Sequence, residues 1–255
     1  MTSDQKESRT PYVETFDDGP GGWVANRHEP LPVWDGAATC YGPWYVDANH
    51  APPGAGYLHM LMWIHTKAAY VTAVGGQNRF VLENKSRDFT NAKLTVRLRG
   101  ELSLEGVKVH PFSTPEWAPK GDEADLLGAK LCLLVQTEGP GHTHPYPNII
   151  LTGQPLRVTR DWSEQTLTLT TDPAQWTQCG VRHDLTHRYG PGDIAAMLAD
   201  VSIDLIFVLF PLKVVPVGPV EDLHRQWADR DYRVDPRYLP RGLVMFDTVR
   251  IDYPD

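Results

Sequence analysis

Short segments in which apolar and polar residues alternate recur along this chain, and they constrain its fold more than any other feature. Residues 93–99 alternate leucine or valine with lysine, threonine or arginine, and residues 165–171 alternate leucine with threonine. Successive side chains of a strand point to opposite faces, so each segment predicts a strand with one buried face. Residues 201–210 are nearly all apolar, which is typical of a strand covered on both faces.

The joints between these segments are rich in turn-forming residues, with 21 Gly and 22 Pro in the chain. The one convincing helical signal is short and covers residues 191–198, with Asp193 placed as the N-cap. Many short strands without strand–helix alternation favour an all-β fold, an antiparallel β-sandwich of the jelly-roll type with long elaborated loops. We expect residues 1–10 to form a disordered tail and residues 11–255 to form a single domain.

Charge and hydropathy narrow the range of partners. The formal net charge of −8 argues against nucleic acid and against anionic membrane surfaces, because both require clustered lysine and arginine. No apolar run approaches the length of a membrane span, and the polar N-terminus has no apolar signal core. We therefore expect a cytoplasmic protein, or a secreted one whose leader is absent from this chain. The sequence leaves the oligomeric state open.

The strand predicted over residues 56–65 has two dissimilar faces. One parity carries only leucine, methionine and isoleucine, whereas the other carries Tyr57, His59, Leu61, Trp63 and His65. A face that combines rings and imidazoles suits a ligand with polar edges and weakly apolar faces, and a sugar fits that description. The alternative is that a second layer covers this strand and that its histidines are satisfied in the interior.

The segment that leads into this strand adds polar groups among aromatic ones. Asp47 and His50 would form a hydrogen-bonded acid–base pair in which the carboxylate orients the imidazole. Trp44, Tyr45 and Asn49 would bind substrate beside them, together with Trp63 of the strand. The alternative is an aromatic plug in which Asp47 and Asn49 cap turns.

Arg97 and Arg99 share the polar face of the strand predicted over residues 93–99. If that face continues the His59 surface, both guanidinium groups would bind the carboxylate of an acidic sugar, with Gln136 beside them. The alternative is a solvated charged edge.

Three segments resemble the carbohydrate-binding jelly rolls of the galactose-binding-like superfamily. They are residues 14–19 followed by Trp23, Asp161–Trp162 leading into the alternating residues 166–170, and residues 246–251. They occur in the order found in those modules and span nearly the whole chain. The resemblance implies a sandwich fold and a role with carbohydrate.

The same resemblance implies a structural calcium ion, because in those modules carboxylates of the first and last strands often share one. Carried over, the ligands would be Glu14 and Asp247, with Asp17 or Asp18 nearby. The alternative is that Asp18 stabilises a turn and that Asp247 pairs with an arginine.

These observations together favour a carbohydrate-active enzyme that cleaves an oligo- or polysaccharide as a polysaccharide lyase or a glycoside hydrolase. In a lyase, Arg97 would hold the sugar carboxylate, while a histidine or tyrosine would remove the neighbouring proton and protonate the leaving oxygen. Candidates for that proton transfer are His50, Tyr57 and His59. A hydrolase would need two carboxylates, for which Asp47 and Glu116 are candidates. The alternatives are a non-catalytic carbohydrate-binding protein and, from a third class, a cupin-like metal enzyme.

Overall fold

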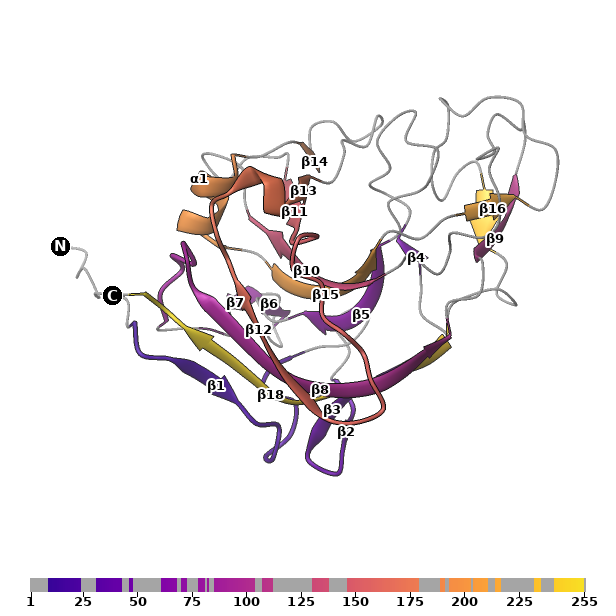
Figure 1. Ribbon diagram of the computed structural model, residues 1–255, viewed down its shortest axis with the longest axis horizontal. Coiled ribbons are helices and arrows are strands. Elements are labelled where there is room, and N and C mark those ends of the chain that lie inside the picture. Colours follow the sequence, from indigo (N-terminus) through magenta and orange to yellow (C-terminus); the bar gives the residue numbers. More distant parts are fainter. Residues whose placement is uncertain are drawn as a thin grey trace.

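The computed structural model describes most of the strands that the sequence predicts. The described residues are 9–23, 31–42, 46–47, 61–67, 70–72, 78–80, 82, 85–103, 107–111, 130–137, 146–178, 189–190, 193–202, 204–210, 214–216, 232–234 and 241–254. Their main feature is two sheets that face each other as a β-sandwich, which confirms the all-β class (Figure 1).

The first sheet has the strand order β12-β8-β18-β3-β2, and β1 also pairs with β18. Its strands are β1 (Tyr12–Glu14), β2 (Val33–Trp34), β3 (Ala37–Tyr41), β8 (Lys93–Ser103), β12 (Ser163–Thr168) and β18 (Arg241–Asp252). All of these pairs are antiparallel. The first and last strands of the chain are therefore neighbours, and β18 is also the partner of β8 and β3.

The second sheet has the order β13-β11-β10-β15-β5-β4, and β14 pairs with β11. Its strands are β4 (Val46–Asp47), β5 (Leu61–Lys67), β10 (Lys130–Gln136), β11 (Tyr146–Ile150), β13 (Thr177–Gln178), β14 (Tyr189–Gly190) and β15 (Asp204–Phe210). Two smaller sheets join β16 (Val214–Pro216), β9 (Val107–Pro111) and β17 (Tyr232–Val234), and β6 (Tyr70–Thr72) with β7 (Asn78–Phe80).

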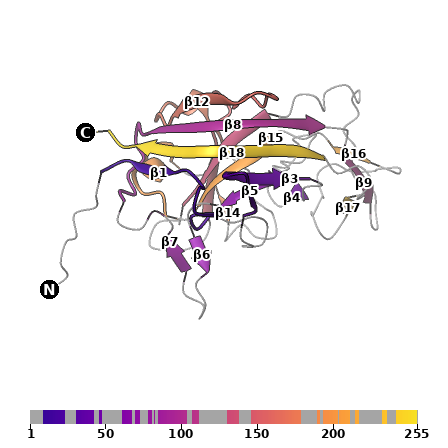
Figure 2. The same cartoon turned by 90° about the horizontal axis from the view of Figure 1, so that it is seen from below.

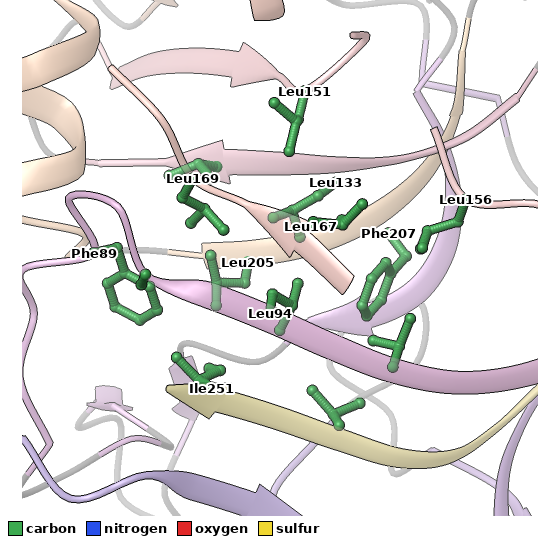
Figure 3. Close-up of a cluster of buried hydrophobic side chains, with 14 of the residues drawn as sticks. Phe89, Leu94, Leu133, Leu151, Leu156, Leu167, Leu169, Leu205, Phe207 and Ile251 are labelled. Atoms are coloured by element: carbon green, nitrogen blue, oxygen red, sulfur yellow. The ribbon is translucent and has the colours of Figure 1, made fainter. Parts of the chain in front are cut away.

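The main hydrophobic core lies between the two large sheets. Leu94, Val96 and Leu98 of β8 face it from the first sheet, as the alternation predicts, and all three are at most 2% exposed. Figure 3 shows Leu94 and Ile251 on one side of this core and residues of β10 and β15, including Phe207, on the other. Burying an apolar side chain of this size stabilises a fold by ~1.5–3 kcal/mol, so this layer holds the sheets together.

The centre of the second sheet is buried on both faces. Besides the residues that face the main core, a second cluster occupies the opposite face and consists of Cys132, Leu134, Ile150, Ile206, Val208 and Phe210. Each of these residues is at most 4% exposed. The sequence of β15 is therefore apolar almost throughout because both faces of the strand are covered, as the sequence analysis predicts.

The predicted helical turn is α1 (Ile194–Ala199), and the Asp193 carboxylate accepts a hydrogen bond of 2.7 Å from the backbone N–H of Ala196. Near the N-terminus, side-chain hydrogen bonds hold residues 9 and 10. Arg9 donates to the backbone oxygen of Pro254 at 2.7 Å, and Lys85 donates to the Thr10 hydroxyl at 2.7 Å. The rest of the predicted N-terminal tail, residues 1–8, lies outside the described residues. Among the described residues, no helix is long and apolar enough to cross a membrane.

Candidate functional site

The outer face of the first sheet, meaning the face turned away from the core, carries polar and charged side chains. Since Leu94, Val96 and Leu98 point into the core, Thr95, Arg97 and Arg99 of the same strand take the outer face, and each is partly exposed. Figure 2 views this sheet with β12, β8 and β18 side by side and with β1 and β3 beyond β18.

Trp162 lies next to both arginines on this face. The guanidinium carbon of Arg97 is 5.0 Å from the centroid of the Trp162 ring, and that of Arg99 is 4.8 Å from it. The contact follows from the register, because Ser163 at the start of β12 pairs with Leu98 and brings the preceding residue beside Arg99. Each cation–π contact of this kind is worth ~0.5–1 kcal/mol at an exposed position, so the three side chains hold one another in place.

Asp247 completes this arginine–tryptophan cluster, which we define as Arg97, Arg99, Trp162 and Asp247. Arg97 Nη1 donates to Asp247 Oδ2 at 2.6 Å, and the Thr248 hydroxyl donates to the same oxygen at 3.1 Å. The register of β18 against β8 shifts between Phe246 and Thr248, so Asp247 occupies a β-bulge. The bulge interrupts the alternation of β18 and presents the carboxylate to Arg97.

Two other arginines on or beside this sheet each pair with a carboxylate, in contrast to Arg99 among the described residues. Arg160 donates to Glu101 at 2.7 Å, and this hydrogen bond, followed by the charge of Arg160, lowers the pKa of the Glu101 carboxyl. Arg250 donates to both carboxylate oxygens of Asp252, and that hydrogen bonding is the main reason why the pKa of Asp252 is lowered. In the part of the chain that the structure describes, no carboxylate pairs with Arg99. Arg99 is therefore a cation beside Trp162 that an added anion can reach without displacing a carboxylate.

The second sheet contains the strand that the sequence analysis assigns to a ligand-binding face. The backbone of β5 pairs with β15 so that Met62 is opposite Leu209, Trp63 is opposite Val208, and Ile64 is opposite Phe207. Leu209 and Phe207 belong to the main core, whereas Val208 belongs to the second cluster and is 0% exposed. At β10 and β15 the outer face of this sheet is thus apolar and closed to solvent.

The other predicted site residues of this region are only partly covered by the structure. Asp47 lies in β4, opposite Leu61 of β5, so its strand does adjoin the one that carries Trp63. Trp44, Tyr45, Asn49, His50, Tyr57 and His59 lie outside the described residues, as does Glu116. Their assignment to catalysis or to substrate binding stays a prediction.

The structure separates two groups that the sequence analysis places together. Arg97 and Arg99 lie on the outer face of the first sheet, whereas Gln136 lies on β10 of the second, opposite Asn148 and Asp204. The main core lies between them, because leucine and valine of β8 face inward and the arginines must face outward. Arg97 and Arg99 therefore do not continue the face of β5, and Gln136 does not lie beside them.

The three predicted calcium ligands are all described. Glu14 Oε1 accepts the backbone N–H of Phe16 at 2.8 Å, Asp18 is exposed in the following turn, and Asp247 pairs with Arg97. Glu14 is opposite Val249, two residues from Asp247. Two of the three carboxylates thus have one oxygen engaged by the protein. Within the described ranges, no three His, Cys, Asp or Glu side chains are grouped to hold a metal ion.

Sequence reasoning assigned no ligand-binding role to Trp162. The position of this tryptophan, immediately before an alternating strand, does indicate a side-chain contact with the adjacent strand. The identity of that neighbour depends on which strands pair and in which register, and local alternation does not specify either.

Comparison with known proteins gives little further guidance. No family model matches the sequence, and no curated protein matches it. Two solved structures are similar over 96% of this chain. One is an immunostimulatory antigen and pseudo β-1,3-glucanase of Mycobacterium tuberculosis, with 13% identity over 98% of that chain and a TM-score of 0.29. The other belongs to the endo-acting O-glycanases that members of the human gut microbiota express to initiate mucin breakdown, with 11% identity over 99% of that chain and a TM-score of 0.32. At TM-scores below 0.5, neither similarity carries an argument about fold or activity.

Proposed function

We propose that this protein acts on carbohydrate and that it binds a saccharide on the outer face of the first sheet. The observation that carries the proposal is the position of Trp162 within 5.0 Å of two guanidinium groups on an exposed sheet face. A saccharide offers C–H groups to an aromatic ring and oxygen atoms to hydrogen-bond donors. The arginine–tryptophan cluster supplies both kinds of partner at one place.

The charges of the cluster favour an acidic saccharide over a neutral one. Asp247 offsets the charge of Arg97, whereas no carboxylate among the described residues offsets that of Arg99. A guanidinium group binds a carboxylate through two parallel hydrogen bonds, which gives both affinity and orientation. The ring of Trp162 limits the positions open to Arg99 and so reduces the entropy lost when a ligand binds.

Cleavage of the glycan is the finer proposal, as a lyase or as a hydrolase. Its proton-transfer residues would be Asp47, His50, Tyr57 and His59, as the sequence analysis predicts. The arginines of the first sheet would not serve that site, so a lyase centred on β5 would need another group to neutralise the sugar carboxylate. Binding without cleavage requires only the arginine–tryptophan cluster.

A binding and product screen separates these possibilities. Purified protein would be run in affinity gels containing polygalacturonate, alginate, hyaluronan, xylan or starch, and each mixture would be assayed for unsaturated products by ultraviolet absorbance and for new reducing ends. We expect retardation by at least one acidic polysaccharide. Products together with binding would support cleavage. If the wild-type protein binds none of the panel and releases no product, the proposed function is wrong.

Substitutions then test the cluster itself. Arg99→Gln should weaken binding of the acidic polysaccharide about tenfold, the loss expected for one charge-assisted pair. Arg160→Gln is the matched control, because Arg160 is an exposed arginine that is already paired with Glu101. Equal losses in both variants would mean that general positive charge, rather than the cluster, attracts the polysaccharide.

A further inference from the structure

A pair of stacked aromatic side chains stands exposed on the same sheet as the arginine–tryptophan cluster. The rings of Trp34 and Tyr41 have centroids 5.3 Å apart and planes inclined by 16°. Trp34 is 48% exposed and Tyr41 is 54% exposed. Among the described residues, the only other large apolar side chain exposed to this degree is Val13, at 49%. Two adjoining exposed rings are unusual on a soluble surface and often mark a binding site.

The local sequence specifies this arrangement. Trp34 ends β2 and Ala37 begins β3, and the two pair across a two-residue turn formed by Asp35 and Gly36. Both turn residues have positive φ, 48° and 72°, which is the conformation of a type I′ hairpin turn and favours the Asp-Gly sequence. The turn thereby fixes Trp34 on the same side of the hairpin as Ala37 and Tyr41. Thr39, between them on that side, is fully buried.

The sheet register connects this aromatic pair to the cluster. Thr39 of β3 is opposite Met245 of β18, and Met245 is in turn opposite Arg99 of β8. Directly opposed residues of antiparallel strands share a face, so all of them lie on the outer face. Trp162 adjoins Arg99 at the start of β12. Strands lie ~4.8 Å apart, so the strands of Tyr41 and Trp162 are separated by ~14 Å across three strand spacings.

We propose that Trp34 and Tyr41 form a second subsite, and that the outer face of the first sheet binds an extended acidic oligosaccharide that crosses the strands from this aromatic pair to Arg99 and Trp162. The inference rests on the proposed function and specifies its ligand. One sugar unit is too short to contact both ends. The acidic group is held at Arg99, and another unit of the same chain stacks on the exposed ring of the aromatic pair.

The surroundings of the pair favour a saccharide over a protein partner. Stable protein interfaces bury about 800 Å² on each side, and charged residues are depleted at their centres. Among the described residues, only these two rings are exposed here, and Leu243 and Met245 of β18 separate them from Glu101 and Arg99 of β8. Glu101 is paired to Arg160. A small aromatic surface with charged groups two strands away suits a polar ligand that has short apolar patches.

Dependence on oligosaccharide length tests the second subsite. Oligosaccharides from monosaccharide to hexasaccharide would be prepared from the acidic polysaccharide that binds the wild-type protein most tightly, and their affinities measured by calorimetry. Wild-type affinity should rise with length. Trp34→Ala and Tyr41→Ala should each weaken hexasaccharide binding about three- to tenfold and leave monosaccharide binding unchanged. Val13→Ala is the matched control for an exposed apolar side chain of the same sheet, and it should change neither.

The other outcomes are decisive as well. An unchanged hexasaccharide affinity in both variants overturns the inference, as does an equal loss at every length, which would show a structural effect. Trp34→Phe keeps a stacked ring and should restore most of the hexasaccharide affinity, which guards against misfolding of the alanine variant. A changed oligomeric state of Trp34→Ala in light scattering, with unchanged affinity, would assign the pair to self-association. Binding of neutral polysaccharides alone would overturn this inference, whereas no binding and no product with the whole panel would refute the proposed function.

Discussion

Arg97 on β8 donates a hydrogen bond of 2.6 Å from Nη1 to Oδ2 of Asp247, the residue that occupies the bulge of the neighbouring strand β18. The Arg97 side chain is 43% exposed and that of Asp247 is 32% exposed, so solvent weakens their attraction. The pair therefore contributes less than ~1 kcal/mol to the stability of the fold. Its larger effect is on the charge of the site, because Asp247 offsets one of the two cations beside Trp162.

Asp247→Asn should therefore increase the affinity for an acidic saccharide. Removing the carboxylate frees Arg97 and removes a group that repels anions, so we expect a gain of about two- to fivefold at low salt and a smaller gain at high salt. Calorimetry at two salt concentrations measures the gain, with Asp252→Asn, which breaks an exposed pair on the same sheet, as the control. A loss of affinity in Asp247→Asn would mean that the carboxylate itself contacts the ligand.

Phe207 joins the two sheets of the sandwich and should be the costliest position to truncate. It is fully buried, it stacks on Phe246 of the first sheet at 4.7 Å, and it packs against Trp23 at 6.3 Å. Phe207→Ala should lower the free energy of unfolding by ~3–5 kcal/mol, since it removes the ring and leaves a cavity. Urea unfolding followed by tryptophan fluorescence measures this change. Val13→Ala, at an exposed position, should stay within ~0.5 kcal/mol of the wild type.

Much of the fold could be predicted from local sequence pattern, and the reason is visible in particular strands. The alternation over residues 93–99 belongs to β8 and the apolar run before Phe210 belongs to β15, because burial on one or two faces is written in neighbouring residues. The start of α1 at Ile194 follows from a single side chain, Asp193, that caps the helix. Such signals need no knowledge of the rest of the chain.

The candidate site was harder to predict because it depends on contacts between distant segments. Arg97 was identified as a candidate, yet its neighbours are Asp247, 150 residues away, and Trp162. The pairing of β8 with both β12 and β18 creates those contacts, and no local pattern specifies which strands pair. Because strand pairing was unknown, the sequence analysis also expected Gln136 beside the arginines, although the core separates β10 from the outer face of β8.

Calcium binding remains a proposal that thermal unfolding can test. If Glu14, Asp18 and Asp247 hold the ion, added calcium should raise the melting temperature and a chelator should lower it, since a ligand that binds only the folded state adds ~2.7 kcal/mol at a hundredfold excess over its Kd. Magnesium serves as the control ion. Glu14→Gln should abolish the difference between calcium and chelator. An identical melting temperature of the wild-type protein in both would contradict the proposal.

Cys132 should make the protein sensitive to alkaline conditions. Burial raises the pKa of its thiol to about 12, with a small opposing effect from the charge of Lys130. In the unfolded chain the thiol titrates near its ordinary pKa of ~8.5, so the folded state binds a proton that the unfolded state loses. The stabilisation is complete below that value and is lost as the pH rises toward 12, by up to ~1.4 kcal/mol per pH unit. Urea unfolding at a series of alkaline pH values should show a shallower decline in the free energy of unfolding for Cys132→Ala than for the wild type.

The accessibility of the Cys132 thiol is tested separately. Mass spectrometry after treatment with iodoacetamide at mildly alkaline pH should find Cys132 unmodified in the native protein and modified in urea. Rapid native modification would show that the outer face of the second sheet opens to solvent.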